Sequence, residues 1–259
     1  MVECVVLAGG FNEELTAKEA VPNKALLKIG QKEMVRYVLE TYCQLEEIER
    51  IVLVGPVEKF SFLQKDYPLE LVPEDISLLD NVVAGNRFLQ TANPLLISTA
   101  DIPLVTPAAV KDFLQQCLPY DNDFYYPIVT KAECEEKFPG VQRTFVPLRE
   151  GVFTGGNIFL VNPLKIESSI PLVQQFLAYR KNPLKMASLL GTGFVLRALT
   201  KRLTLASLES RFSALLEVKA QAIISKYAEI SFDVDKPGDL ALVRQILEKG
   251  PAEKSSSEI

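Results

Sequence analysis

The fold is indicated first by residues 2–10, which read VECVVLAGG. Residues 2–7 form a nearly continuous apolar run, typical of a strand that is buried on both faces of a parallel sheet. The small residues Ala8, Gly9 and Gly10 follow at once. Such a turn lets a ligand approach the bare backbone, where N–H groups can face phosphate oxygens. A plain tight turn is the alternative interpretation.

A lysine follows this turn closely in the sequence. Lys24, in the stretch PNKALL at residues 22–27, supplies a cation near the glycines, and the combination indicates a protein that handles nucleotides. The chain contains neither G-x-G-x-x-G nor G-x-x-x-x-G-K-S/T. Rossmann-type dinucleotide binding and P-loop hydrolysis are therefore disfavoured.

Composition restricts the size of the fold, the classes of partner and the expected location of the protein. The 259 residues, 48% of them hydrophobic, suffice for one large α/β domain or two small ones. A net charge of −5 argues against general nucleic-acid binding. The four cysteines form no C-x-x-C pair, and no secretion signal or membrane-spanning run is seen, so we expect a cytoplasmic protein with reduced thiols.

The chain contains no histidine. This excludes Ser-His-Asp triads, His-Glu-x-x-His zinc sites and imidazole bases. Chemistry would have to come from carboxylates, lysine, arginine, hydroxyls, thiols or a hard metal. Carboxylates without histidine or thiolate partners favour Mg²⁺ over zinc.

Strand and helix patterns alternate through the first half and predict an α/β fold with a mostly parallel sheet. Strands are expected at 2–7, 51–54, 69–72 and 94–99, and helices at 33–45, 80–90 and 107–117. After residue 120 we expect strands at 124–130, 144–148 and 157–161 without intervening helices, then a helix-rich stretch, strands at 219–224 and 230–234, and a helix at 237–248. We predict one domain over 1–248, with a helical insert at about 168–216, and a flexible tail at 249–259.

Asp101 stands at the carboxyl end of the apolar run 95–99, in the stretch TADIP. In open α/β sheets this edge is where ligands bind. Asp101 is therefore a candidate metal ligand, and a loop-capping aspartate is the alternative.

Asp233 and Asp235 belong to the stretch FDVDKPGDL at residues 232–240. On a strand, residues i and i+2 point to the same face, so either aspartate could hold Mg²⁺ together with Asp101. Asp235 is favoured because it lies nearer the end of the strand. Asp235 and Asp239 also suit the start of a helix, as a cap and a first-turn acid.

Residues 153–157 read FTGGN, with two glycines and an amide just before a strand. Gly155, Gly156 and Asn157 would allow close approach of a small substrate, with Asn157 donating and accepting hydrogen bonds. A plain turn into the strand explains them equally well.

Together these segments resemble the MobA-like nucleotidyltransferases, relatives of molybdenum-cofactor guanylyltransferase and of the sugar-1-phosphate nucleotidyltransferases. The resemblance rests on residues 7–10 (LAGG), 23–26 (NKAL), 99–103 (TADIP) and 233–240 (DVDKPGDL), in that order. It implies a three-layer α/β/α fold of the GT-A type, with a mostly parallel mixed sheet.

The resemblance also implies roles for individual residues. The backbone of Leu7, Ala8, Gly9 and Gly10 would contact the nucleotide, as would Ala100, and Lys24 would neutralise the phosphates. Asn81 lies where the family reads the base or the ribose. Asp101 and Asp235 would carry Mg²⁺, so that Lys24 and Asp101 serve catalysis, and Gly155, Gly156 and Asn157 would bind the acceptor.

The implied reaction moves an NMP from an NTP to a small phosphorylated acceptor and releases pyrophosphate. The chain departs from the family in residues 11–21, which contain neither glycine nor arginine. This departure supports one alternative, a nucleotide-binding regulator without catalysis. A GT-A glycosyltransferase that uses a nucleotide-sugar is a second alternative.

The helical insert is unusually basic. Residues 168–208 contain no Asp or Glu, but they carry Arg180, Lys181, Lys185, Arg197, Lys201 and Arg202 among many apolar residues. This composition suits peripheral membrane contact or a lid over an anionic substrate. Packing of the helices on the sheet or at a homodimer interface is the alternative.

Overall fold

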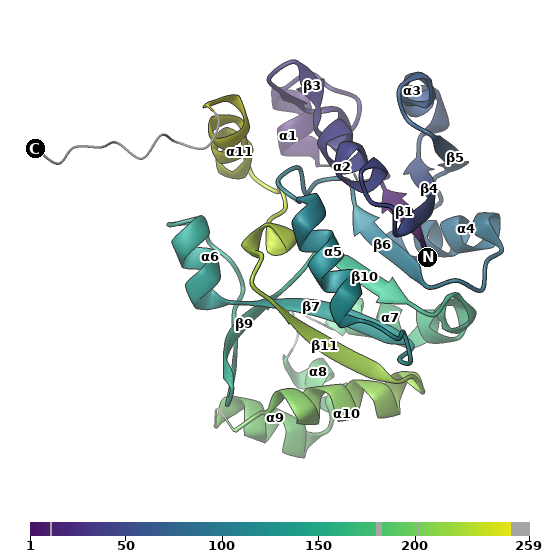
Figure 1. The fold of residues 1–259 in the computed structure, drawn as a ribbon. Coiled ribbons are helices and arrows are strands. Elements are labelled where there is room, and N and C mark those ends of the chain that lie inside the picture. Colours follow the sequence, from purple (N-terminus) through teal and green to yellow (C-terminus); the bar gives the residue numbers. More distant parts are fainter. Residues whose placement is uncertain (11, 180–182, 201, 250–259) are drawn as a thin grey trace, which may run out of the picture.

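A mixed sheet of nine strands forms the centre of the molecule, with helices on both of its faces (Figure 1). The computed structural model describes residues 1–10, 12–179, 183–200 and 202–249. The predicted three-layer α/β fold is confirmed.

The first half of the sheet is parallel and the second half is mixed. The order is β5 (Leu69–Pro73), β4 (Ile48–Gly55), β1 (Val2–Leu7), β6 (Leu95–Thr99), β10 (Ile158–Val161), β7 (Phe124–Thr130), β9 (Gly151–Gly155) and β8 (Val146–Leu148), and β11 (Ala220–Ser225) pairs with β7. The strands from β5 to β6 run parallel, β10 runs antiparallel to both of its neighbours, and β11 is parallel to β7. The short strands β2 (Lys28–Ile29) and β3 (Lys32–Glu33) form a separate pair.

Strand β1 is buried along its whole length, as its apolar run predicts. Cys4 and Val6 pack into a core with α2 (Met34–Cys43) and α5 (Pro107–Gln116). Val5 and Leu7 point to the opposite face and pack with α4 (Leu78–Leu89) and α7 (Ile166–Tyr179). This alternation places β1 in the middle layer of the three.

Two expectations about the second half are wrong. Residues 230–234 form no strand, because η4 (Ala228–Ser231) occupies the start of that stretch and the following residues are irregular. A short helix, α6 (Lys131–Lys137), separates β7 from β8, where no helix was expected. Thr130 and Glu133 form a capping box that starts this helix.

The remaining elements are short connections, helices of the insert and the closing helix. They are α1 (Glu13–Lys18), η1 (Lys24–Leu26), α3 (Val57–Phe60), η2 (Ser61–Lys65), η3 (Pro163–Lys165), α8 (Pro183–Leu190), α9 (Thr192–Leu199), α10 (Leu205–Leu216) and α11 (Pro237–Lys249). Arg180, Lys181, Lys201 and residues 250–259 of the predicted tail lie outside the described residues. Within the described ranges, no helix combines the length and the apolar character needed to cross a bilayer.

Candidate functional site

The site lies where β1 and β6 end side by side. Leu7 is the last residue of β1, and its carbonyl accepts a hydrogen bond from the Ala100 N–H at 3.0 Å. The Ala8 N–H donates to the Val54 carbonyl on the other side at 2.8 Å. These bonds hold the small-residue turn next to Asp101, as expected for carboxyl ends of neighbouring parallel strands.

Asn23 fixes Lys24 beside this turn. The buried Asn23 side chain donates to the Ala8 carbonyl at 2.8 Å and accepts from the Ala25 N–H at 2.7 Å. It thereby caps η1, which begins at Lys24. Sequence analysis did not single out Asn23, although an asparagine directly before a helical turn is a recognisable cap.

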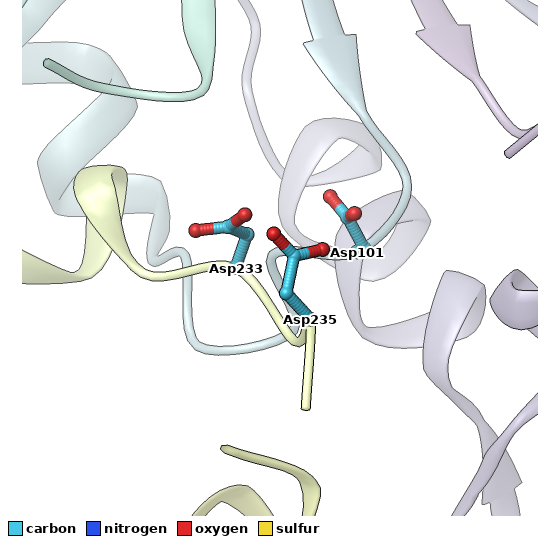
Figure 2. Close-up of side chains that lie close together, drawn as sticks. All are labelled: Asp101, Asp233 and Asp235. Atoms are coloured by element: carbon cyan, nitrogen blue, oxygen red, sulfur yellow. The ribbon is translucent and has the colours of Figure 1, made fainter. Parts of the chain in front are cut away.

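Three carboxylates converge on this edge of the sheet. Asp101, Asp233 and Asp235 each offer an oxygen within 4.8 Å of the other two, and Figure 2 shows the three side chains close together. The Val234 N–H donates to the Asp101 carbonyl at 2.9 Å, which places the segment 233–235 against the end of β6. We call these residues the three-carboxylate cluster.

Lys24 is paired with two members of the cluster. Its Nζ lies 2.6 Å from Asp101 Oδ2 and 2.6 Å from Asp235 Oδ1, and its side chain is only 9% exposed. Burial lowers the pKa of Lys24, but the two carboxylates outweigh burial and raise the pKa above its ordinary value. For Asp235, burial acts to raise the pKa, but the hydrogen bond from Lys24 outweighs burial. The pKa of Asp235 therefore lies below its ordinary value.

Asp233 pairs with no lysine among the described residues, and its pKa shifts in the opposite direction from that of Asp235. Burial and the charges of Asp101 and Asp235 raise the pKa of Asp233 to about 7. The Asn157 amide lies 3.4 Å from Asp233 Oδ1, and Arg143 lies 3.9 Å from the same oxygen. The cluster therefore holds more negative charge than its neighbours balance near neutral pH.

The cluster fits a hard divalent cation. Its donors are all carboxylate oxygens, which Mg²⁺ prefers. Asp101 Oδ1 is buried and has no hydrogen-bond partner among the described residues. A cation would satisfy that oxygen and offset the repulsion at Asp233. Sequence analysis left the choice between Asp233 and Asp235 open and favoured Asp235, and the structure places both of them beside Asp101.

We expect stabilisation by Mg²⁺ to depend on pH. The pKa of folded Asp233, about 7, lies above its unfolded value of about 3.9, so this group stabilises the metal-free fold below about pH 4. That contribution is lost as the pH rises through 7, where the ionised carboxylate becomes available to Mg²⁺. Thermal unfolding with and without Mg²⁺ should show a larger rise in Tm at pH 8 than at pH 5.5.

The matched variant for this measurement is Asp233→Asn. It cannot titrate, so the stability of the metal-free protein should fall less between pH 4 and pH 7 than in the wild type. An equal Mg²⁺-induced rise in Tm at both pH values in the wild-type protein would contradict the prediction.

Gly9 packs closely against residues that follow β5. A Cβ on Gly9 would lie 2.6 Å from Glu74 Oε2 and 2.8 Å from Asn81 Nδ2, whereas a Cβ on Gly10 would have no atom of the described residues within 4 Å, its chain neighbours aside. The Asn81 side chain is buried, and its Oδ1 accepts the Asp75 N–H at 2.6 Å. The structure thus places Asn81 against the glycine turn. The contacts of Leu7, Ala8, Gly9, Gly10, Asn81 and Ala100 with a nucleotide stay predictions.

A cavity of about 650 Å³ adjoins the three-carboxylate cluster, and we call it the site cavity. Its wall includes Arg143, Thr154, Gly155, Asn157, Asp233 and Asp235. Two of the three residues predicted to bind an acceptor thus line it. Their role as an acceptor site stays a prediction.

Arg143 is the site residue that sequence analysis missed. Its side chain is 10% exposed and lies over the Phe232 ring at 4.9 Å, and its Nε has no partner among the described residues. Burial lowers the pKa of this guanidinium, against the opposing charge of Asp233. At 3.9 Å the contact with Asp233 is too long for a hydrogen bond. Arg143 therefore offers unused donors to an anion in the site cavity.

Packing accounts for the two glycines at 155 and 156. A Cβ on Gly155 would lie 1.5 Å from the Tyr126 hydroxyl oxygen, and one on Gly156 would lie 2.7 Å from Ile230 Cγ2. The Asn157 N–H donates to the Ile230 carbonyl at 2.9 Å. These contacts hold Asn157 beside Asp233.

Comparison with known proteins gives one family match. The MobA-like NTP transferase domain matches residues 4–208. A hypothetical transferase from Thermus thermophilus is 35% identical, with a TM-score of 0.80, over 92% of this chain and 98% of that one. A search of curated proteins found no match.

Two more distant structures share the fold. A 4-diphosphocytidyl-2C-methyl-D-erythritol synthase from Anaerococcus prevotii is 12% identical, with a TM-score of 0.61, over 96% of each chain. Molybdopterin-guanine dinucleotide biosynthesis protein A from Archaeoglobus fulgidus is 14% identical, with a TM-score of 0.54, over 96% of this chain and 100% of that one.

Proposed function

We infer that this chain, which belongs to the MobA-like NTP transferase domain family and is a nucleotidyltransferase, acts on a small phosphorylated acceptor. An acceptor phosphate oxygen attacks the α-phosphorus of an NTP and forms a new phosphoanhydride bond. The bond from the α-phosphorus to the bridging oxygen breaks, and pyrophosphate leaves with that electron pair.

The observation that carries this proposal is the pairing of Lys24 with the three-carboxylate cluster beside a cavity lined by Arg143, whose Nε has no hydrogen-bond partner among the described residues. Phosphoryl and nucleotidyl transfer require positioning and charge stabilisation more than a strong base. A phosphate monoester is largely ionised at pH 7, because its second pKa is about 6. Such an acceptor needs no histidine to activate it, and the chain has none.

Each group has a role in this proposal. The backbone of residues 7–10 contacts the nucleotide, Asn81 lies near its base or ribose, and Lys24 neutralises its phosphates. Asp101, Asp233 and Asp235 would hold Mg²⁺, which supplies charge neutralisation and orientation of the phosphates when bound. Arg143 binds the acceptor phosphate, and Asn157 orients the acceptor.

The direct test is titration with each NTP in the presence of Mg²⁺, followed by a pyrophosphate-release assay across phosphorylated acceptors. Release of pyrophosphate that needs both an NTP and an acceptor supports the proposal. Turnover of a nucleotide-sugar without pyrophosphate would instead indicate a glycosyltransferase. Nucleotide binding without turnover across the panel would favour the regulator.

Arg143→Met should raise KM for the acceptor by about 10- to 100-fold, because hydrogen bonds to charged groups contribute about 1.5–3 kcal/mol. KM for the NTP should change little. Arg143→Lys keeps the charge but loses the planar fork, so we expect an intermediate effect. The control is Arg87→Met, at an exposed arginine on α4 that pairs with Glu167. A rise in KM for the NTP instead of the acceptor would overturn the assignment.

Other expectations stay predictions for this protein. They are a cytoplasmic location, a homodimer, and peripheral membrane contact through the helical insert. Three of the insert's cations, Arg180, Lys181 and Lys201, lie outside the described residues.

A further inference from the structure

A second cavity, of about 390 Å³, lies between the sheet and α10, and we call it the apolar cavity. Alternate residues of a strand face the same side, so Phe124, Tyr126 and Ile128 of β7 line it together. Leu208 and Phe212 of α10 line it from the other side. Its volume falls in the usual range for small-molecule sites, about 300–1,000 Å³.

The walls of the apolar cavity are built from packed aromatic rings. The Phe159 ring centroid lies 5.2 Å from that of Tyr126, with the two planes 6° apart, and 5.9 Å from that of Phe124. On the helical side, Phe212 stacks on Phe176 at 4.8 Å. These ring pairs make the wall of the cavity aromatic on both its sheet side and its helical side.

The apolar cavity offers almost nothing to a polar ligand. Among the described residues of its wall, Glu209 is the one carboxylate, and its Oε1 already accepts the Ala222 N–H at 2.8 Å. The other polar side chains of its wall are Tyr126, Thr154 and Gln221, so a polar ligand group placed against the aromatic rings would lose its water without gaining a partner, which is unfavourable. A hydrocarbon would gain from burial in the same place.

The apolar cavity adjoins the site cavity. Thr154 and Gly155 belong to the walls of both. The Tyr126 hydroxyl lies at this boundary, so close to Gly155 that a Cβ there would overlap it. A molecule bound near Arg143 and the three-carboxylate cluster therefore has an apolar space next to it.

We propose that the apolar cavity binds a hydrocarbon tail carried by the phosphorylated acceptor. The proposal rests on the proposed function for the identity of the acceptor, but the cavity's preference for hydrocarbon can be measured separately. The phosphate would bind at Arg143 in the site cavity, and the tail would pass the Thr154–Gly155 boundary and lie against the aromatic wall.

The first experiment measures binding of linear alkyl phosphates, from ethyl to dodecyl, by titration calorimetry. Affinity should rise about fourfold for each added methylene and then level off when the cavity is full. Affinity that does not depend on chain length would overturn the proposal.

The second experiment locates the tail. The chain has no tryptophan, so Phe212→Trp places a single reporter in the wall of the apolar cavity. Phe88→Trp is the matched control, at a ring that is 44% exposed on α4. An alkyl phosphate brominated near the end of its chain should quench the emission of Phe212→Trp much more than that of Phe88→Trp. Equal quenching in the two variants would overturn the proposal.

The third experiment fills the cavity. Ala222→Phe should abolish the dependence of affinity on chain length and leave the affinity for ethyl phosphate unchanged. Ala108→Phe, at an exposed position of α5, is the control and should retain the dependence. If Ala222→Phe does not fold, the quenching experiment decides alone.

The pyrophosphate assay separates this proposal from the proposed function. If short acceptors are turned over but affinity does not depend on chain length, the proposed function is supported and the hydrocarbon-tail site is wrong. If affinity rises with chain length but no NTP gives pyrophosphate release, the hydrocarbon site is supported and the proposed function is wrong.

Discussion

Asp101→Asn is expected to lower kcat for pyrophosphate release by about 10³-fold, which corresponds to about 4 kcal/mol of transition-state stabilisation. An amide cannot replace the carboxylate toward a cation, and it weakens the bond to Lys24. The fold should persist, because the bond from the Val234 N–H to the Asp101 backbone carbonyl does not involve the side chain, and the amide oxygen can still accept a hydrogen bond from Lys24. Steady-state kinetics at saturating Mg²⁺ and NTP gives the measurement.

The matched control for this substitution is Asp112→Asn on α5. Asp112 accepts a hydrogen bond from Gln116 and lies outside the site, and an amide oxygen can accept the same bond. Both variants should unfold at nearly the wild-type temperature. Turnover by Asp101→Asn at the wild-type rate would remove Asp101 from the metal site.

The sequence was sufficient to predict the part of the site that comes from neighbouring parallel strands. The apolar runs at residues 2–7 and 95–99 mark two central strands, so the residues that follow them must meet at one edge of the sheet. Lys24 could be placed nearby because few residues separate it from the turn. The bond from Asn23 to Ala8 completes that placement.

The segment at 230–234 was harder to predict because its apolar alternation resembles a strand. Its backbone instead bonds to two different partners, Asn157 through the Ile230 carbonyl and Asp101 through the Val234 N–H. Isolated hydrogen bonds to separate partners do not form a β-ladder, and the sequence contains no pattern that predicts such bonds. Asp233 and Asp235 nevertheless lie close to Asp101, because the irregular segment runs past the end of β6 (Figure 2).

Arg143 illustrates what sequence patterns do not contain. It lies in an irregular stretch between α6 and β8, where no periodicity assigns it a face. Its contacts, Asp233 and Phe232, are far away in the chain. The glycines at 155 and 156 suggested an acceptor site in the sequence. Packing against Tyr126 and Ile230 is sufficient to explain why both residues are glycine.

Lys24→Met is expected to have two opposite effects, because the ammonium and a metal ion share the same carboxylates. In this variant the ammonium no longer competes with Mg²⁺ for the carboxylates of Asp101 and Asp235. Mg²⁺ should therefore bind about tenfold more tightly when no nucleotide is present. Turnover should nevertheless fall by about 10²–10³-fold, since a charged donor to the phosphates is lost. Calorimetric titration with Mg²⁺ and steady-state kinetics measure the two effects.

The stability of Lys24→Met shows whether the missing ammonium charge or the changed side-chain shape causes its effects. Removing one partner of a buried ion pair costs about 3–5 kcal/mol, and we expect about 2 kcal/mol here because Asp235 is 60% exposed. Mg²⁺ should restore most of that loss in Lys24→Met, while the exposed Lys18→Met should show neither the loss nor the restoration. Weaker Mg²⁺ binding by Lys24→Met would mean that the lysine helps to build the metal site instead of competing for it, and the proposed division of roles between Lys24 and the cation would be wrong.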